Sequence, residues 1–168
     1  DKVYHSLDRK VANALLKAET PPSAIYAYED GASLSFSAAK ERNITCIYDL
    51  PIGYWRAARR IQSEEAELLP EWAATMPALT DSAPKLERKD DELRLADSII
   101  VASQFTANTL KETPFNLPEP IIIPYGSPLP QATVTPESDS GAPLKVLYVG
   151  GLTQRKGIAY LLEAVEQL

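Results

Sequence analysis

Two glycines and two cations near the carboxyl end of the chain have the arrangement of an anion-binding turn. The apolar run Leu144–Val149 is followed by Gly150 and Gly151 and then by Arg155 and Lys156, after which apolar residues recur at helical spacing. The pattern predicts a strand, a tight turn and a helix. A cation at a helix start faces the positive end of the helix dipole, and the first turn contains no capping acid. A phosphate or pyrophosphate, bound by free N–H groups and both cations, would account for these residues.

The same residues also fit a turn that binds no ligand. Strand–turn–helix junctions occur throughout α/β proteins, and Arg-Lys pairs are common on exposed surfaces. The turn lacks the Gly-Lys-Ser/Thr ending of a P-loop and the G-x-G-x-x-G pattern of a dinucleotide-binding fold. Both interpretations of the turn therefore remain open from the spacing alone.

The rest of the chain alternates between extended and helical patterns. Strands are predicted at residues 24–28, 44–48, 98–102 and 120–123, the last of them buried. Helices are predicted at residues 3–18, 30–42, 54–76 with a break near Pro70, 84–96 and 104–112. This alternation predicts right-handed βαβ crossovers and an α/β fold with a parallel, Rossmann-like sheet flanked by helices. Ligands of such sheets bind beyond the carboxyl ends of the strands.

Several side chains have a predicted structural role in these elements. Asp30 is placed to cap the helix over residues 30–42, and Ser103 to cap the helix that follows it. The mixed charges of residues 85–92 predict a solvated helix face, with Arg88 and Glu92 spaced to pair. Cys46 lies inside an apolar strand pattern, which indicates buried packing.

Composition excludes several classes of protein. The chain has 168 residues and a formal net charge of −6, which argues against a nucleic-acid binder. A single cysteine allows neither an internal disulfide nor a cysteine-based metal site, and the single histidine, His5, has no partner nearby. No apolar run is long enough to span a membrane and no signal peptide is recognisable, so we expect a cytoplasmic protein.

The order of motifs resembles a known enzyme family. Residues 96–103 read A-D-S-I-I-V-A-S, residues 123–126 read I-P-Y-G, and after a Pro/Ser/Thr/Gly-rich stretch residues 146–157 carry the G-G-L-T-Q-R-K-G loop. This order is similar to the middle of GT-B fold glycosyltransferases of family 4, also called group 1, from about Ile25 onward. The resemblance implies an amino-terminal Rossmann-like, acceptor-side domain at 1–126 that lacks its first strand, a linker at 127–143, and the start of a donor-binding domain at 144–168.

The resemblance also implies roles for the residues of the turn. Lys156 matches the lysine that contacts the diphosphate of the nucleotide-sugar donor, with Gly150 and Gly151 giving it room and Arg155 as a helper. A departing nucleoside diphosphate gains negative charge in the transition state, which preorganised cations stabilise. The implied reaction is transfer of a sugar from a nucleotide-diphosphate sugar, with retention of configuration and with no metal or other cofactor required.

This sequence departs from the family pattern at several points. Gly151 stands where many members have an arginine, and no histidine follows the strand that ends at Asp49. Asp49 is therefore expected either to face the sugar or acceptor, or to cap the turn at 51–53. The family's early glycine-rich loop and its E-x7-E pair are both missing, so we expect this chain to be a truncated central portion that is inactive alone.

Acceptor-side candidates follow the first two strands. They are Glu29, Asp30, Tyr54, Trp55 and Arg56. Aromatic rings stack on sugars and arginines bind phosphate or anionic lipid headgroups, so the expected partners are a sugar or lipid-linked acceptor and a membrane surface, at the inner face of a membrane. Packing of the two aromatic rings beside solvated arginines is the alternative for Tyr54–Arg56.

Two other functions fit the same pattern. A nucleotide-sugar 2-epimerase shares the fold and the diphosphate-binding logic. A non-catalytic Rossmann-like binding module, in which the last strand and helix extend one sheet, belongs to a different class. An upstream glycine-rich loop and a downstream E-x7-E pair would favour the transferase.

Overall fold

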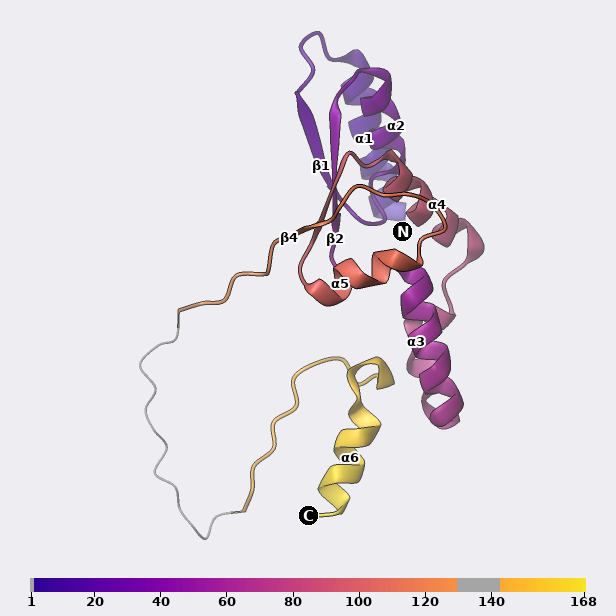
Figure 1. Cartoon of the computed structure of the whole chain (residues 1–168), viewed down its shortest axis with the longest axis vertical. Helices are drawn as coiled ribbons and strands as arrows, with labels where there is room; N and C mark the ends of the chain where they lie inside the picture. Colours follow the sequence, from indigo (N-terminus) through magenta and orange to yellow (C-terminus); the bar gives the residue numbers. More distant parts are fainter. Residues whose placement is uncertain (1, 130–142) are drawn as a thin grey trace.

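A four-stranded parallel sheet is the centre of the fold. In a computed structural model that describes residues 2–129 and 143–168, the strands are β1 (Ala24–Tyr28), β2 (Thr45–Leu50), β3 (Ser98–Val101) and β4 (Ile121–Ile122). All neighbours pair in parallel in the order β1-β2-β3-β4 (Figure 1). The predicted α/β class with a parallel sheet is thus confirmed, and the arrangement is consistent with the predicted Rossmann-like fold.

The helices before, between and after these strands lie near the predicted positions. They are α1 (Lys2–Lys17), α2 (Ser33–Glu41), α3 (Trp55–Leu68), α4 (Ala83–Leu95), α5 (Gln104–Thr109) and α6 (Ile158–Glu166), with 3₁₀ turns η1 (Pro70–Thr75), η2 (Pro77–Leu79), η3 (Leu110–Glu112) and η4 (Gln154–Lys156). The predicted break near Pro70 separates α3 from η1. Ser103 caps α5 as predicted, because its Oγ accepts the N–H of Thr106 at 3.2 Å.

Helices α1, α2 and α4 lie on one side of the strands (Figure 1). The side chains of β2 and β3 that point to this side have no exposed surface, and the buried thiol of Cys46 is among them, as predicted. The opposite side is open among the described residues: Tyr26 is 57% exposed and Ile121 is 50% exposed. The prediction that residues 120–123 form a buried strand is therefore wrong, because β4 is a short edge strand that no described helix covers.

The start of α2 is capped from a distance. Asp8 of α1 is buried, and its carboxylate accepts the N–H groups of Leu34 and Ser35 at 2.9 and 2.8 Å. Asp30, the predicted cap, instead has a left-handed backbone with φ of 72°. Asp8, Ala12 and Leu15 of α1 are buried, whereas Val3 and Leu7 at its start are mostly exposed.

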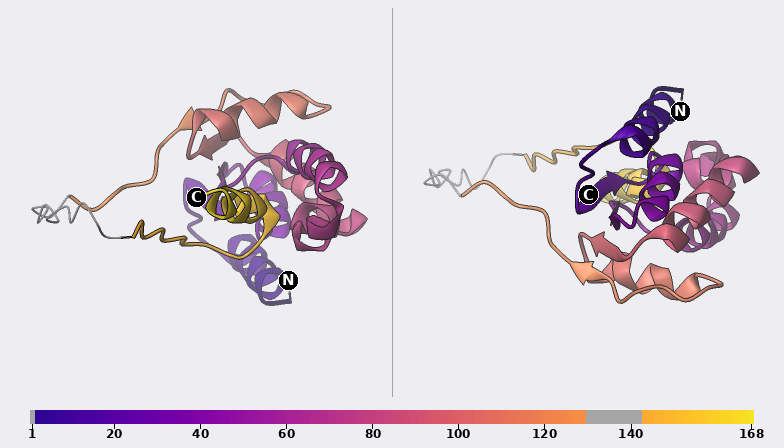
Figure 2. Two further views of the ribbon diagram at one scale, coloured as in Figure 1. Left: turned by 90° about the horizontal axis from the view of Figure 1, so that it is seen from below. Right: turned by 90° about the horizontal axis from the view of Figure 1, so that it is seen from above.

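The carboxyl-terminal segment forms a turn and a helix but no strand. Residues 144–149 pair with no described strand, and the large apolar side chains among them are exposed. The predicted strand is thus not formed, because an extended segment needs a neighbour to satisfy its N–H and C=O groups. Of the predicted linker, 127–129 has no helix or strand, and 130–142 lies outside the described residues. The chain after β4 and the chain before α6 both extend away from the sheet (Figure 2).

Candidate functional site

A cleft lies at the carboxyl ends of the strands. Its first end is a cavity of about 410 Å³ between α3, α5 and the turn before α6. Its second end, of about 250 Å³, lies between the loop after β1, α3 and α4. The two cavities share five lining residues, which are Ile52, Gly53, Ala58, Gln62 and Arg155. They are therefore two ends of one cleft, at the edge where parallel sheets bind ligands.

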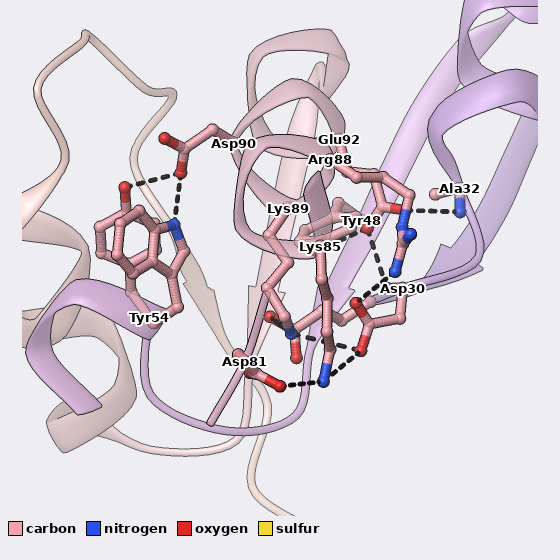
Figure 3. A network of polar contacts seen from close by, with 12 residues as sticks. Asp30, Ala32, Tyr48, Tyr54, Asp81, Lys85, Arg88, Lys89, Asp90 and Glu92 are labelled. Carbon is pink, nitrogen blue, oxygen red and sulfur yellow. Dashed lines mark hydrogen bonds and ion pairs between the residues drawn. The ribbon is translucent and has the colours of Figure 1, made fainter. Parts of the chain in front are cut away.

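Charged side chains of both signs line the second end. Lys89 Nζ lies 2.8 Å from Glu29 Oε1 and 3.3 Å from Asp30 Oδ2. Lys85 Nζ lies 2.7 Å from Asp81 Oδ1, in the same cluster (Figure 3). The side chains of Lys89 and Glu29 are only 5% and 7% exposed. We call this the charged end of the cleft.

Burial sets the electrostatics of the charged end. The pKa of Glu29 is raised, mainly because burial disfavours its ionised form, while the charge of Lys89 opposes the shift. The pKa of Lys85 is also raised, first by its hydrogen bond to Asp81. Carboxylates and ammonium groups held in this way can accept and donate hydrogen bonds, which is what sugar hydroxyls require.

A buried carboxylate supports the loop that carries Glu29 and Asp30. Glu92 on α4 has no exposed surface. It accepts the N–H groups of Asp30 and Ala32 at 2.9 and 3.0 Å and the hydroxyl of Tyr48 at 3.0 Å (Figure 3). Burial raises its pKa even though these three bonds favour the ionised form. The fixed loop holds the two acidic side chains at the cleft.

The predicted solvated face of residues 85–92 is therefore wrong. Lys89, Asp90 and Glu92 are all buried, because α4 packs its charged side against the β1–α2 loop and the start of α3. The predicted pair is present: Arg88 Nε lies 4.0 Å from Glu92 Oε1. Most of the site residues that could not be identified from the sequence lie on this helix. The signal in the sequence that could have indicated them is the high density of mixed charges in α4.

Apolar side chains line the first end. Ile52 precedes α3, Ile61 lies on α3, Phe105 lies on α5, and Tyr160 comes from α6. Three of these side chains, Ile52, Phe105 and Tyr160, are about half exposed or more, so their surfaces are open. We call this the apolar end of the cleft.

The glycine-rich turn contributes one of its two cations to the cleft. Arg155 lines both ends and has no ion-pair partner among residues 2–129 and 143–168. Lys156, Gly150 and Gly151 are exposed and line neither end. The structure thus brings Arg155 together with Glu29 and Asp30 but does not bring the four predicted diphosphate-binding residues together at the cleft.

Gln154 explains how the turn is held. It is 3% exposed, its N–H donates to Thr75 Oγ1 at 3.0 Å, and its Nε2 donates to Glu65 Oε1 at 2.5 Å. Its Oε1 accepts the N–H of Ala159 at 3.0 Å. The expectation of uncapped N–H groups at the start of this helix is therefore corrected, since a neutral amide caps one of them. Sequence reasoning passed over Gln154 because it is neutral.

Tyr54, Trp55 and Arg56 attach α3 to α4. The Tyr54 hydroxyl and Trp55 Nε1 both donate to Asp90 Oδ1, at 2.8 and 2.6 Å. The guanidinium of Arg56 lies 4.3 Å from the centre of the Trp55 ring and 3.3 Å from Asp90 Oδ2. This geometry favours the packing alternative for Tyr54, which is buried, but Arg56 is paired with Asp90 and is not a free, solvated arginine. Trp55 also lines the charged end of the cleft.

Asp49 lies away from the cleft. Its position in β2 pairs with Tyr28 of β1, on the open face of the sheet, and its carboxylate accepts the hydroxyl of Tyr26. That hydrogen bond is the main reason that the pKa of Tyr26 is raised to about 12. Asp49 neither lines the cleft nor accepts a hydrogen bond from the 51–53 turn in the described part of the chain.

Comparisons with known proteins add no family to this description. No family model, no curated protein and no solved structure matches the chain. None of the described helices has the length and apolar character needed to cross a bilayer. Within the described residues, no three His, Cys, Asp or Glu side chains gather as a metal site would need.

Proposed function

We propose that the chain carries out part of a glycosyl transfer from a nucleotide-diphosphate sugar to an acceptor, with retention of configuration. The observation that carries this proposal is Arg155, a guanidinium without an ionic partner among the described residues, which lines the same cavity as Glu29 and Asp30. The motif order that resembles GT-B glycosyltransferases supports it, as does the position of the cleft at the carboxyl ends of parallel strands.

The cleft offers the groups that this reaction needs. As the bond between the anomeric carbon and the diphosphate breaks, the leaving group gains negative charge, which the Arg155 guanidinium would stabilise. The carboxylates of Glu29 and Asp30 and the ammonium of Lys89 would bind sugar hydroxyls by charge-assisted hydrogen bonds. Lys156, which is exposed and adjacent to Arg155 in the sequence, would meet the diphosphate when the donor enters past Gly150 and Gly151.

Calorimetric titration of the 168-residue chain with UDP and with GDP tests the proposal. We expect one of the two to bind, and Arg155→Ala to weaken binding by about 10- to 100-fold, the value of a hydrogen bond to a charged group. Lys145→Ala removes an exposed cation from the segment before the turn and is the matched control, for which we expect no change. The proposal fails if neither nucleotide binds or if Arg155→Ala behaves like the control.

A second assay separates transfer from the alternatives. Because the chain is expected to be inactive alone, it is fused to a donor-binding segment that carries an E-x7-E pair and incubated with the nucleotide sugar of the base that binds. Free nucleoside diphosphate would be released if the fusion transfers sugar to an acceptor or to water. A 2-epimerase would change the configuration of the bound sugar, and a binding module would leave the nucleotide sugar intact.

A further inference from the structure

The two ends of the cleft differ in chemistry although they share five lining residues. The charged end presents Glu29, Asp30 and Lys89, whereas the apolar end presents Ile52, Ile61 and Phe105. A ligand that fills the whole cleft must therefore be amphiphilic. A free oligosaccharide would place hydroxyl groups against hydrocarbon, and a purely apolar ligand would leave the charged end in water.

Three polar side chains of the apolar end already form hydrogen bonds within the protein. Gln154 uses Nε2 on Glu65 Oε1 and Oε1 on the N–H of Ala159. Gln62 Oε1 accepts a backbone N–H at 3.0 Å. Thr109 Oγ1 accepts one backbone N–H at 2.9 Å and donates to a carbonyl at 2.6 Å. Apart from the charged Arg155 and Glu65, the remaining side chains of this end offer mainly apolar surface, which suits a hydrocarbon.

We propose that the cleft binds an acceptor in which a sugar or polyol is joined to an apolar aglycone or lipid chain. The hydroxylated part lies between the β1–α2 loop and α4, and the hydrocarbon lies between α3 and α5. The role as acceptor rests on the proposed glycosyl transfer, and it narrows the expected acceptor from a sugar or a lipid-linked molecule to one that carries both a hydroxylated and an apolar part. Arg155, at the junction of the two ends, would then bring the donor diphosphate to the acceptor hydroxyl.

The size of the apolar end agrees with this assignment. A cavity of about 410 Å³ lies in the range of small-molecule sites, about 300–1,000 Å³. Its walls come from three separate segments, α3, α5 and the turn before α6, so a bound chain would contact both the sheet-bearing part and the carboxyl-terminal segment. Ligand binding there would join these two parts more firmly.

The proposal can be tested with two glucosides that differ only in the length of their alkyl chain. The chain is titrated with n-octyl β-D-glucoside, below its micelle concentration, and with methyl β-D-glucoside, and shifts of the isoleucine δ-methyl NMR signals are followed. We expect octyl glucoside to shift the signals of Ile52 and Ile61 and to bind at least tenfold more tightly than methyl glucoside. Equal affinities, or shifts confined to Ile121 on the open sheet face, would overturn the proposal.

Two substitutions on α3 provide a matched comparison. Ile61 lines the cleft, whereas Leu68 is 71% exposed and lies outside it. We expect Ile61→Gln to weaken octyl glucoside binding at least tenfold and Leu68→Gln to leave it unchanged, with equal melting temperatures for both variants. Phe105→Ala, on α5, should weaken binding in the same direction and serves if Ile61→Gln fails to fold.

The titrations with UDP and GDP distinguish a failure of this proposal from a failure of the proposed function. If UDP or GDP shifts Ile61 and displaces octyl glucoside, the base occupies the apolar end and the proposal is wrong. If octyl glucoside binds in the cleft while neither nucleotide binds anywhere, the amphiphile site stands and the glycosyl transfer fails. If a nucleotide binds with the Arg155 dependence given above and octyl glucoside does not, the transfer stands and this proposal fails.

Discussion

The side-chain amide of Gln154 donates to Glu65 Oε1 at 2.5 Å and so joins the turn before α6 to α3. The same side chain accepts the N–H of Ala159 at 3.0 Å. One buried residue therefore both caps a helix and attaches it to a neighbour. Because Arg155 follows Gln154 directly, the position of the guanidinium at the cleft depends on this joint.

We expect Gln154→Ala to loosen the carboxyl-terminal segment without unfolding the sheet. The variant leaves the buried N–H of Ala159 and a half-buried carboxylate oxygen of Glu65 without this hydrogen bond, which costs about 1–3 kcal/mol. Hydrogen exchange should become at least tenfold faster in α6 and stay unchanged in β2. Gln167→Ala, at an exposed position after α6, is the control. Equal protection of α6 in Gln154→Ala and the wild type would show that apolar contacts alone hold the segment.

The loop at the charged end depends on Glu92. Replacement by alanine removes the acceptor for two backbone N–H groups and the Tyr48 hydroxyl; two of these three hydrogen bonds are buried and the third is partly buried. We expect Glu92→Ala to lower the free energy of unfolding by about 3 kcal/mol or more, measured by urea denaturation. Glu87→Ala, at an exposed position of the same helix, should change it by less than about 0.5 kcal/mol. Similar losses in the two variants would contradict this role.

Asp8, which caps the start of α2, is also expected to contribute to the stability of the fold. Its carboxylate accepts two N–H groups at the helix start, where negative charge also meets the positive end of the dipole. We expect Asp8→Ala to lower the free energy of unfolding by about 1–2 kcal/mol, measured by urea denaturation. Asp91→Ala, which removes an exposed aspartate paired with Arg94, should have little effect. The role would be refuted if Asp91→Ala cost as much.

Periodicity was sufficient to predict the sheet and its helices. Local patterns of apolar residues and helix breakers predict the strands at 24–28 and 98–101 and the helices on either side of Pro70. These patterns involve only residues that are close in sequence. The run at 144–149 has an equally clear pattern but forms no strand. Pairing needs a second strand, and none of the described residues supplies one.

The site could be predicted only in part. Glu29 and Asp30 could be named because they follow a strand and the loops at the carboxyl edge of a parallel sheet converge. Arg155 could be named only as a cation beside a helix start, because residues 144–149 form no strand. The contributions of Lys89, Glu92 and Gln154 depend on which face of each helix packs against those loops. That packing is determined by contacts between residues that are far apart in sequence. Charge density in α4 could not show that its acids and bases would be buried with partners.

The ionisation of Glu29 is expected to make the stability of the folded chain depend on pH. Burial raises its pKa above the ordinary value of 4.5, Asp30 and Glu92 add to the shift, and Lys89 opposes it. The folded chain therefore keeps this proton to a higher pH than the unfolded chain does. The resulting contribution to stability is complete below pH 4.5 and is lost as the pH rises through the folded pKa.

Glu29→Gln isolates this contribution, because glutamine cannot ionise. The free energy of unfolding of the wild type minus that of the variant should fall as the pH rises from 4 to 7, measured by urea denaturation at each pH. The same difference for Glu64→Gln, which alters a glutamate that is 61% exposed, should stay nearly flat. A difference that rises with pH for Glu29→Gln would mean that attraction to Lys89 outweighs burial and that the pKa of Glu29 is lowered instead.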